Sequence, residues 1–509
     1  MLGKIKEIIE KIENSSAPLH YFALSFLFIV ILRSFLESLS DTDIWGTIKP
    51  LVIIHYISFY VTLAALLIAL FYFVTKVDLN KIYKIILSGF VILVSVPLSD
   101  LIISGGKGYD IAYLLPEIHG NLLSRFLTFF GEFYISGMGI TPGIRIEIIL
   151  VLLGSFAYFW LKKVGWIKNI IATFLVYLLI FLYLSFPFIA KSILELINLD
   201  YKYSPTLMFR FSLLIFLLVS VLAAYAVNRI NFKLILKDIR PFRVLHFESM
   251  FFIGVLFALK NYNFTLTTDN LFCFIFIPIA IVSAWIFSVI TNNIQDVETD
   301  KISNKERPLI KESMDPVFYN RIAWLFFFLA LIYAGFINFT AFFVILLFIG
   351  NYFLYSMPPF RLKRVPFFSK IFISLNSLIL LMLGFVLISG ISIENIPISN
   401  SLFFLILIML TAVINFIDIK DYEGDKKEGI KTLPVLMGLK RSKILISIFF
   451  AIAYLFVCFL TKDLSTLIIF FVLGCLQVYL INRKNYNEKY IFIIYLSSVL
   501  YLITQYLLP

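Results

Sequence analysis

The sequence predicts an all-α polytopic membrane protein with about fifteen transmembrane helices. Of its 509 residues, 61% are hydrophobic and 15% are charged, and its mean hydropathy is +0.97. Apolar runs of about 20 residues, the length that a helix needs to cross the hydrocarbon core, recur along the whole chain. A transmembrane β-barrel would instead show short segments of alternating polarity. We therefore expect helices throughout.

The chain begins with an amphipathic, charged stretch, residues 1–19, which lacks the apolar core of a signal peptide. We expect it to form an interfacial helix that lies on the membrane before the first span. Residues 20–230 then predict an N-terminal membrane domain of about six spans, for which the sequence indicates no function. The runs are Tyr21–Leu39, Leu51–Val74, Ile85–Ile103, Ile144–Leu161, Ile170–Ile189 and Leu207–Val227.

A basic polar stretch, Asn228–Arg243, marks the best boundary between two domains. We place the second domain at residues 237–509, where further apolar runs predict nine spans. These runs cover 246–260, 270–291, 318–336, 338–356, 367–389, 401–418, 442–460, 464–482 and 489–508.

The formal charge of +12, from 43 Lys and Arg against 31 Asp and Glu, does not indicate nucleic-acid binding here. The basic residues lie mostly in short loops between spans, which is the pattern that orients membrane proteins. The cysteines Cys273, Cys458 and Cys475 all lie inside apolar runs. We interpret them as packing residues, since neither a disulfide framework nor a zinc site fits that placement.

Two spans of the second domain end in a series of carboxylates. Residues four apart on a helix share one face, so Asn292, Asp296 and Asp300 predict one line of oxygen ligands. Asp418, Asp421 and Asp425, spaced three and four apart, predict another. Carboxylates at a span end are costly unless they are paired or bind cations, and Mg²⁺ takes few carboxylates and prefers substrate phosphates as its other ligands. The two series together predict a magnesium-bound diphosphate site, although either alone would also fit a solvated acidic loop.

A basic loop lies between the two series, in the segment YSMPPFRLKR at Tyr355–Arg364. The paired prolines end a helix, and cations follow them. We expect Lys363 and Arg307 to hold phosphate oxygens. Arg361 is a further candidate for diphosphate binding, although it fits a topology anchor equally well. Tyr355, at the start of this segment, is also a candidate for diphosphate binding.

From about residue 237 to the C-terminus, the sequence resembles the UbiA family of intramembrane prenyltransferases. The resemblance rests on the N-x₃-D-x₃-D series that begins at Asn292 and on NKERPL at Asn304–Leu309. It also rests on YSMPPFRLK, which begins at Tyr355, and on DYEGDKKEGIKTLPVLMG at Asp421–Gly438. The chain departs from the family at Asn293, where the family often has Asp. The N-terminal half is not part of the family pattern.

The resemblance implies a nine-helix bundle whose central cavity lies under a polar cap. In such a protein, a polyprenyl diphosphate binds through Mg²⁺, and its prenyl group passes to a lipophilic acceptor in the membrane. An aromatic or quinone-precursor acceptor fits the motifs best. The expected partners are these two substrates and membrane lipids, and the sequence indicates no protein partner. The implied catalytic residues are Asp296, Asp300, Asp421 and Asp425, and the implied metal ligands are Asn292, Asp296, Asp300, Asp418, Asp421 and Asp425.

Two other function classes remain. A transporter would place carboxylates in the centres of spans, whereas here they cluster at span ends. A catalytically silent lipid-binding protein would not need complete ligand series. For the acceptor, His246 and Glu248 are polar residues in an apolar setting. They lie two apart, roughly 200° around a helix, so at most one should face the cavity.

The basic loops predict that the catalytic cap lies on the cytoplasmic side of the cell membrane. With the same rule, the basic loops of the N-terminal half fall inside only if an even number of crossings lies between Ile103 and Ile144. The one candidate there is Leu122–Met138, a short run broken by Arg125, Gly131 and Glu132. We therefore expect it to re-enter or to lie on the outer surface.

Overall fold

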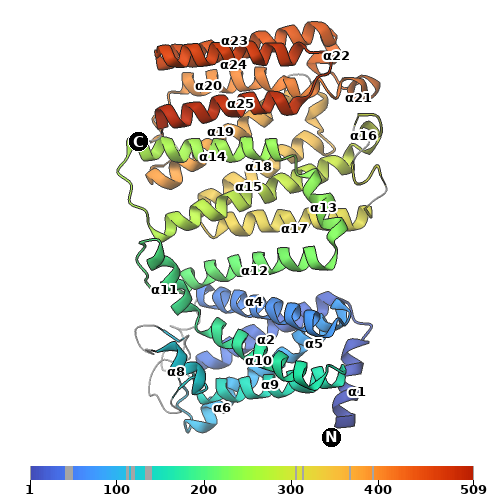
Figure 1. Ribbon diagram of the computed structural model, residues 1–509, viewed down its shortest axis with the longest axis vertical. Coiled ribbons are helices and arrows are strands. Elements are labelled where there is room, and N and C mark those ends of the chain that lie inside the picture. Colours follow the sequence, from blue (N-terminus) through green and yellow to red (C-terminus); the bar gives the residue numbers. More distant parts are fainter. Residues whose placement is uncertain are drawn as a thin grey trace. The chain divides into compact units, whose positions relative to one another are not determined.

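The computed structural model describes residues 2–39, 50–109, 114–115, 121–131, 140–303, 307–311, 314–365, 368–392 and 395–507. The chain divides into two compact units, Met1–Arg229 and Ile230–Pro509 (Figure 1). All regular secondary structure in the described residues is helical, as the composition predicts. In these residues, fourteen helical segments are long and apolar enough to cross a membrane. The protein is therefore an integral membrane protein.

Six of these segments lie in the first unit. The predicted interfacial stretch forms the amphipathic helix α1, which packs against α5. The helices of this unit are α1 (Leu2–Glu13), α2 (Leu19–Leu39), α4 (Pro50–Thr75), α5 (Leu79–Gly89), α6 (Ser95–Ile103), α8 (Leu122–Leu127), α9 (Pro142–Leu161), α10 (Trp166–Leu184), α11 (Phe186–Leu196) and α12 (Pro205–Val227).

The first unit differs from the predicted runs at three places. The run predicted at Ile170–Ile189 is divided, since α10 ends at Leu184 and α11 begins at Phe186. A 3₁₀ segment, Phe90–Val94, joins α5 to α6, so the third span begins at Leu79. The broken run at 122–138 forms only the six-residue helix α8 in its described part, and residues 132–139 lie outside the described residues. Six residues rise roughly 9 Å, which is too short to cross a membrane.

The second unit contains the other eight segments. Its last predicted run forms the 15-residue helix α25 and continues as a five-residue π-helical turn, Ile503–Leu507. The helices are α13 (Arg229–Asp238), α14 (Pro241–Asn261), α15 (Thr268–Gln295), α16 (Val297–Ser303), α17 (Pro316–Gly335), α18 (Phe339–Ser356), α19 (Phe368–Ser389), α20 (Asn400–Val413), α21 (Tyr422–Lys427), α22 (Leu433–Met437), α23 (Leu439–Thr461), α24 (Leu464–Asn482) and α25 (Glu488–Leu502).

Helices α14 and α19 cross closely at Gly254 and Gly384. A Cβ atom at Gly254 would lie 1.9 Å from the carbonyl oxygen of Leu381, and one at Gly384 would lie 2.1 Å from that of Phe251. Small residues let membrane helices approach to this distance. The crossing holds the polar residues of α14 against those of α19, and α15 packs beside them against α17 and α18.

Candidate active site

A cavity of about 150 Å³ lies in the second unit, where α14, α15, α18 and α19 meet the 3₁₀ helix η4 (Ile414–Asp418). It brings together nine of the ten residues that the sequence singles out, from segments far apart in the chain. Arg361 does not line the cavity itself. The nine are Asn292, Asp296, Asp300, Arg307, Tyr355, Lys363, Asp418, Asp421 and Asp425.

The first carboxylate series crosses a break between two helices. Helix α15 ends at Gln295, Asp296 takes the C-cap position, and α16 begins at Val297. The backbone N–H groups of Asp296 and Asp300 still donate to the carbonyls four residues earlier, at 3.0 and 2.8 Å. The helical spacing is thereby kept, and all three side chains line the cavity. The amide oxygen of Asn292 accepts a hydrogen bond of 2.9 Å from the Ser356 hydroxyl.

The second series lies on η4 and α21. Asp418 ends η4, Asp421 precedes α21, and Asp425 lies within it. Burial, together with the neighbouring carboxylates of Asp418 and Asp421, raises the pKa of Asp425 to about 7. The Oδ2 atom of Asp418 is buried without a hydrogen-bond partner in the described chain. These oxygens have the chemistry of Mg²⁺ ligands, and a cation would satisfy them.

The described side chains do not converge on a metal position in this conformation, since no group of three His, Cys, Asp or Glu among them could hold one. Lysine and arginine side chains lie against the carboxylates of the first series instead. Lys363 forms an ion pair with Asp296, and Arg361 reaches the same carboxylate at 2.9 Å. Arg307 lies 3.7 Å from Asp300. The two predicted phosphate clamps, Arg307 and Lys363, therefore neutralise the first series.

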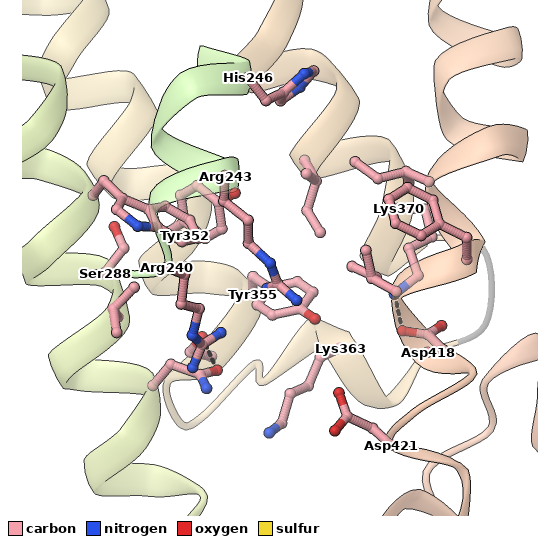
Figure 2. Close-up of a pocket in the computed structure, with 18 of the residues that line it drawn as sticks. Arg240, Arg243, His246, Ser288, Tyr352, Tyr355, Lys363, Lys370, Asp418 and Asp421 are labelled. Carbon is pink, nitrogen blue, oxygen red and sulfur yellow. Dashed lines mark hydrogen bonds and ion pairs between the residues drawn. The ribbon is translucent and has the colours of Figure 1, made fainter. Parts of the chain in front are cut away.

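Three further cationic side chains line the cavity, and they were not assigned to it from the sequence. Lys370, at the start of α19, lies 2.6 Å from Asp418, and Arg240 and Arg243 lie at the start of α14. Burial, together with the guanidinium groups of Arg307 and Arg243, lowers the pKa of Arg240 to about 10. Figure 2 shows Arg243 pointing to the centre of the cavity beside Tyr355, with the Lys370–Asp418 pair to one side. The sequence signal that could have identified Lys370 is its position inside an apolar run.

Asn293, the departure from the family pattern, lies behind the cavity wall. It is buried and is not a lining residue. Its amide nitrogen donates to Asp238 at 2.6 Å and to the Tyr319 hydroxyl at 3.0 Å, and its amide oxygen accepts from Arg240 at 3.0 Å. Asp238 in turn holds Arg307 at 2.7 Å. Asn293 thus helps to hold Arg240 directly and Arg307 through Asp238. The three predicted ligand positions do not depend on it.

One of the two polar residues of α14 reaches the cavity, as their spacing predicts. His246 lines it, and Glu248 does not. The Nε2 atom of His246 lies 2.8 Å from the Ser377 hydroxyl of α19, and Nδ1 lies 3.0 Å from the Tyr495 hydroxyl of α25. The ring is therefore fixed by groups from two other helices.

Comparison with known proteins assigns a family to this unit. Residues 249–499 match the model of the UbiA prenyltransferase family. A digeranylgeranylglyceryl phosphate synthase from Pyrococcus horikoshii is 33% identical over 162 residues, which cover 31% of this chain and 54% of that protein. One from Thermococcus gammatolerans is 30% identical over 169 residues, with 33% and 58% covered. The chain thus spans about half the length of these two relatives.

A plant protein and a solved structure are also similar. The chloroplastic 2-acyl-4-prenylphloroglucinol 6-prenyltransferase of Humulus lupulus is 31% identical over 180 residues, which cover 32% of this chain and 41% of that protein. The structure of a UbiA homologue from Archaeoglobus fulgidus, bound to GPP and Mg²⁺, is 21% identical with a TM-score of 0.40; the match covers 53% of this chain and 98% of that one. The family match confirms the resemblance: the C-terminal unit contains a UbiA prenyltransferase family domain.

Proposed function

We propose that the C-terminal unit transfers a prenyl group from an allylic polyprenyl diphosphate to a lipophilic acceptor within the membrane, in a reaction that requires Mg²⁺. One observation carries the proposal: two carboxylate series and five cationic side chains line a single cavity at the ends of apolar helices. A diphosphate with its metal needs both kinds of group, whereas an ion transporter would not need the cationic side chains. The family domain supports the same activity.

Acidic and basic residues have different roles in this proposal. The carboxylates of Asp296, Asp300, Asp421 and Asp425 would hold Mg²⁺, with Asn292 and Asp418 as further ligands. When bound, Mg²⁺ supplies a Lewis acid to the leaving diphosphate. Arg307 and Lys363 would leave their present carboxylate partners and bind phosphate oxygens instead. Arg361 would act on the site through its ion pair with Asp296. These cations then stabilise the charge that develops on the leaving group.

The allylic carbon lies between this cap and the apolar part of the cavity. The bond from C1 to the diphosphate oxygen breaks, and an acceptor oxygen or carbon forms the new bond to C1. The acceptor's proton leaves with the released diphosphate, which takes it up. The Tyr355 ring lines the cavity beside the cap and offers a π face to the developing cation. The prenyl chain would lie against apolar lining residues such as Leu410, Val413 and Phe492.

Two acceptor classes compete. The motifs favour an aromatic acceptor, whereas two of the relatives named above are digeranylgeranylglyceryl phosphate synthases. Arg240 and Arg243 favour the second class, because they add positive charge beyond the predicted clamps and so suit an acceptor that carries a phosphate of its own. We therefore rank a prenylglyceryl phosphate first and an aromatic acceptor second.

The test uses the full chain in nanodiscs with labelled geranylgeranyl diphosphate and Mg²⁺. Geranylgeranylglyceryl phosphate and an aromatic hydroxy acid are offered in separate reactions. We expect a labelled lipid product and one diphosphate released per product. Release of diphosphate without any prenylated product, with either acceptor, would contradict prenyl transfer. A product with the aromatic acid alone would reverse the ranking.

A further inference from the structure

The first unit contains a cavity larger than that of the second, about 520 Å³ in volume. This size falls in the range of small-molecule sites. Its lining is mostly aliphatic and aromatic, from α1, α2, α4, α5, α9, α10, the start of α12 and the 3₁₀ segment Phe90–Val94. On α4 the lining residues extend from Val52 to Phe71, which is roughly 29 Å of helix at 1.5 Å per residue. The cavity is therefore long and follows a membrane helix over nearly the thickness of the hydrocarbon core.

Two glycines leave the cavity open. Gly89 and Gly154 both line it, and a Cβ atom built at either position would meet no atom within 4 Å. Both glycines are exposed, so the space beside them is open, and a larger side chain at either position would narrow the cavity.

Two charged residues line this largely apolar cavity, among those that the structure describes: Arg33 and Glu147. Polar side chains such as His55 and Ser155 also line it. Arg33 is 1% exposed, pairs with Glu37 and lies 5.0 Å from the centre of the Tyr56 ring. Its Nε atom has no hydrogen-bond partner among the described residues. Arg33 also lies 5.6 Å from the centre of the Tyr60 ring, and Tyr60 interacts electrostatically with Glu147, so both charged residues lie near Tyr60. A buried donor without an acceptor costs free energy, and a ligand oxygen would remove that cost.

We propose that this cavity binds a membrane lipid with one long apolar chain and a neutral hydroxyl head group. The hydroxyl oxygen accepts from Arg33, and its hydrogen is donated to Glu147. A phosphate head is disfavoured, because its negative charge would lie near the carboxylates of Glu37 and Glu147 in a medium of low dielectric. Among the described lining residues, Arg33 is the one Lys or Arg that would offset these charges. The proposal concerns the first unit alone and does not rest on the proposed prenyl transfer.

The test is photolabelling of the full chain in nanodiscs with a diazirine analogue of geranylgeraniol, followed by mass spectrometry of the labelled peptides. Competitors are geranylgeraniol, a saturated fatty alcohol, geranylgeranyl phosphate and a long-chain hydrocarbon. We expect saturable labelling of α4 or α9 that both alcohols reduce and the hydrocarbon does not. The stronger alcohol competitor identifies the chain as isoprenoid or acyl. Labelling that the hydrocarbon reduces equally would mean general lipid partition and would overturn the proposal.

Variants make the test specific to this cavity. Gly154→Leu fills the open space, and labelling should fall at least about tenfold, which corresponds to about 1.4 kcal/mol. Gly350→Leu is the matched control, because Gly350 also lies in a helix with nothing within 4 Å of its Cβ position but lines neither cavity. Glu147→Gln removes one negative charge, so geranylgeranyl phosphate should become a better competitor by about tenfold. Unchanged labelling in Gly154→Leu, or stronger competition by the phosphate than by the alcohol in the unmodified protein, would refute the proposal.

Discussion

The ammonium group of Lys370 lies 2.6 Å from a carboxylate oxygen of Asp418, and both side chains are buried. A cation of the chain thus takes the place beside Asp418 that we assign to Mg²⁺. Removing one partner of a buried ion pair leaves an uncompensated charge, at a cost of about 3–5 kcal/mol. Without metal, Lys370→Met should therefore lower the unfolding temperature.

Mg²⁺ should restore much of that loss, because it can neutralise Asp418 in place of the lysine. The measurement is thermal unfolding in detergent with EDTA and with Mg²⁺. Lys443→Met is the control, since Lys443 is also buried but donates to the carbonyl oxygen of Arg483 at 2.9 Å. A Mg²⁺ shift of equal size in both variants would mean that Asp418 is not a metal ligand.

Asp296→Asn and Asp425→Asn should each lower kcat/KM for prenyl transfer at least about a hundredfold, because each removes a charge from the proposed metal site. Both proteins should still insert and unfold cooperatively. Asp315→Asn serves as the control: Asp315 caps α17, and asparagine caps a helix equally well. Near-normal turnover in both site variants would rule out the metal-site assignment.

Prenyl transfer should stop in EDTA and return with Mg²⁺. Binding should also stabilise the protein by about 2.7 kcal/mol at a Mg²⁺ concentration one hundred times Kd, which a thermal shift with and without the prenyl diphosphate would detect. Activity that persists in rigorously metal-free buffer would contradict the role of Mg²⁺.

Arg307→Ala and Lys363→Ala should weaken diphosphate binding more than acceptor binding, since both are assigned to the leaving group. The expected loss is about tenfold or more in the Kd for the diphosphate, with little change in the KM for the acceptor. Arg364→Ala is the neighbouring control, because Arg364 follows Lys363 but does not line the cavity. Equal effects on both substrates would assign the two residues to structure or topology.

We propose that the catalytic cap faces the cytoplasm and that the run at 122–138 does not cross the membrane. One crossing, α9, would then separate Lys107 from Lys163. In a variant without the native cysteines, Lys107→Cys should react with an impermeant reagent from outside the cell and Lys163→Cys should not. Both positions are exposed in the structure. Reaction at both, or at neither, would place them on one side and add a crossing.

We also propose that the two compact units correspond to the domains that the sequence predicts at 20–230 and 237–509. Their boundary at Arg229 lies in the basic stretch Asn228–Arg243. A change from apolar runs to a polar, charged segment is local information, and it is readable without a structure.

The sequence by itself determined the helices and the chemical types at the cap. Membrane spans follow from continuous apolar length, and helical spacing alone predicts that Asn292, Asp296 and Asp300 share a face. Both are short-range properties, so the break between α15 and α16 did not change the outcome. The same rule correctly limited His246 and Glu248 to one contact with the cavity.

Only the tertiary structure decided which acidic and basic side chains pair with each other. Lys370 and Asp418 are 48 positions apart, and Arg307 and Asp238 are 69 apart, so no local spacing relates them. The glycine contact of α14 and α19 brings His246 to Ser377, and the packing of helices from the whole length of the first unit creates its cavity. Such contacts depend on how helix faces fit together in three dimensions, and apolar periodicity in one chain does not encode which faces meet.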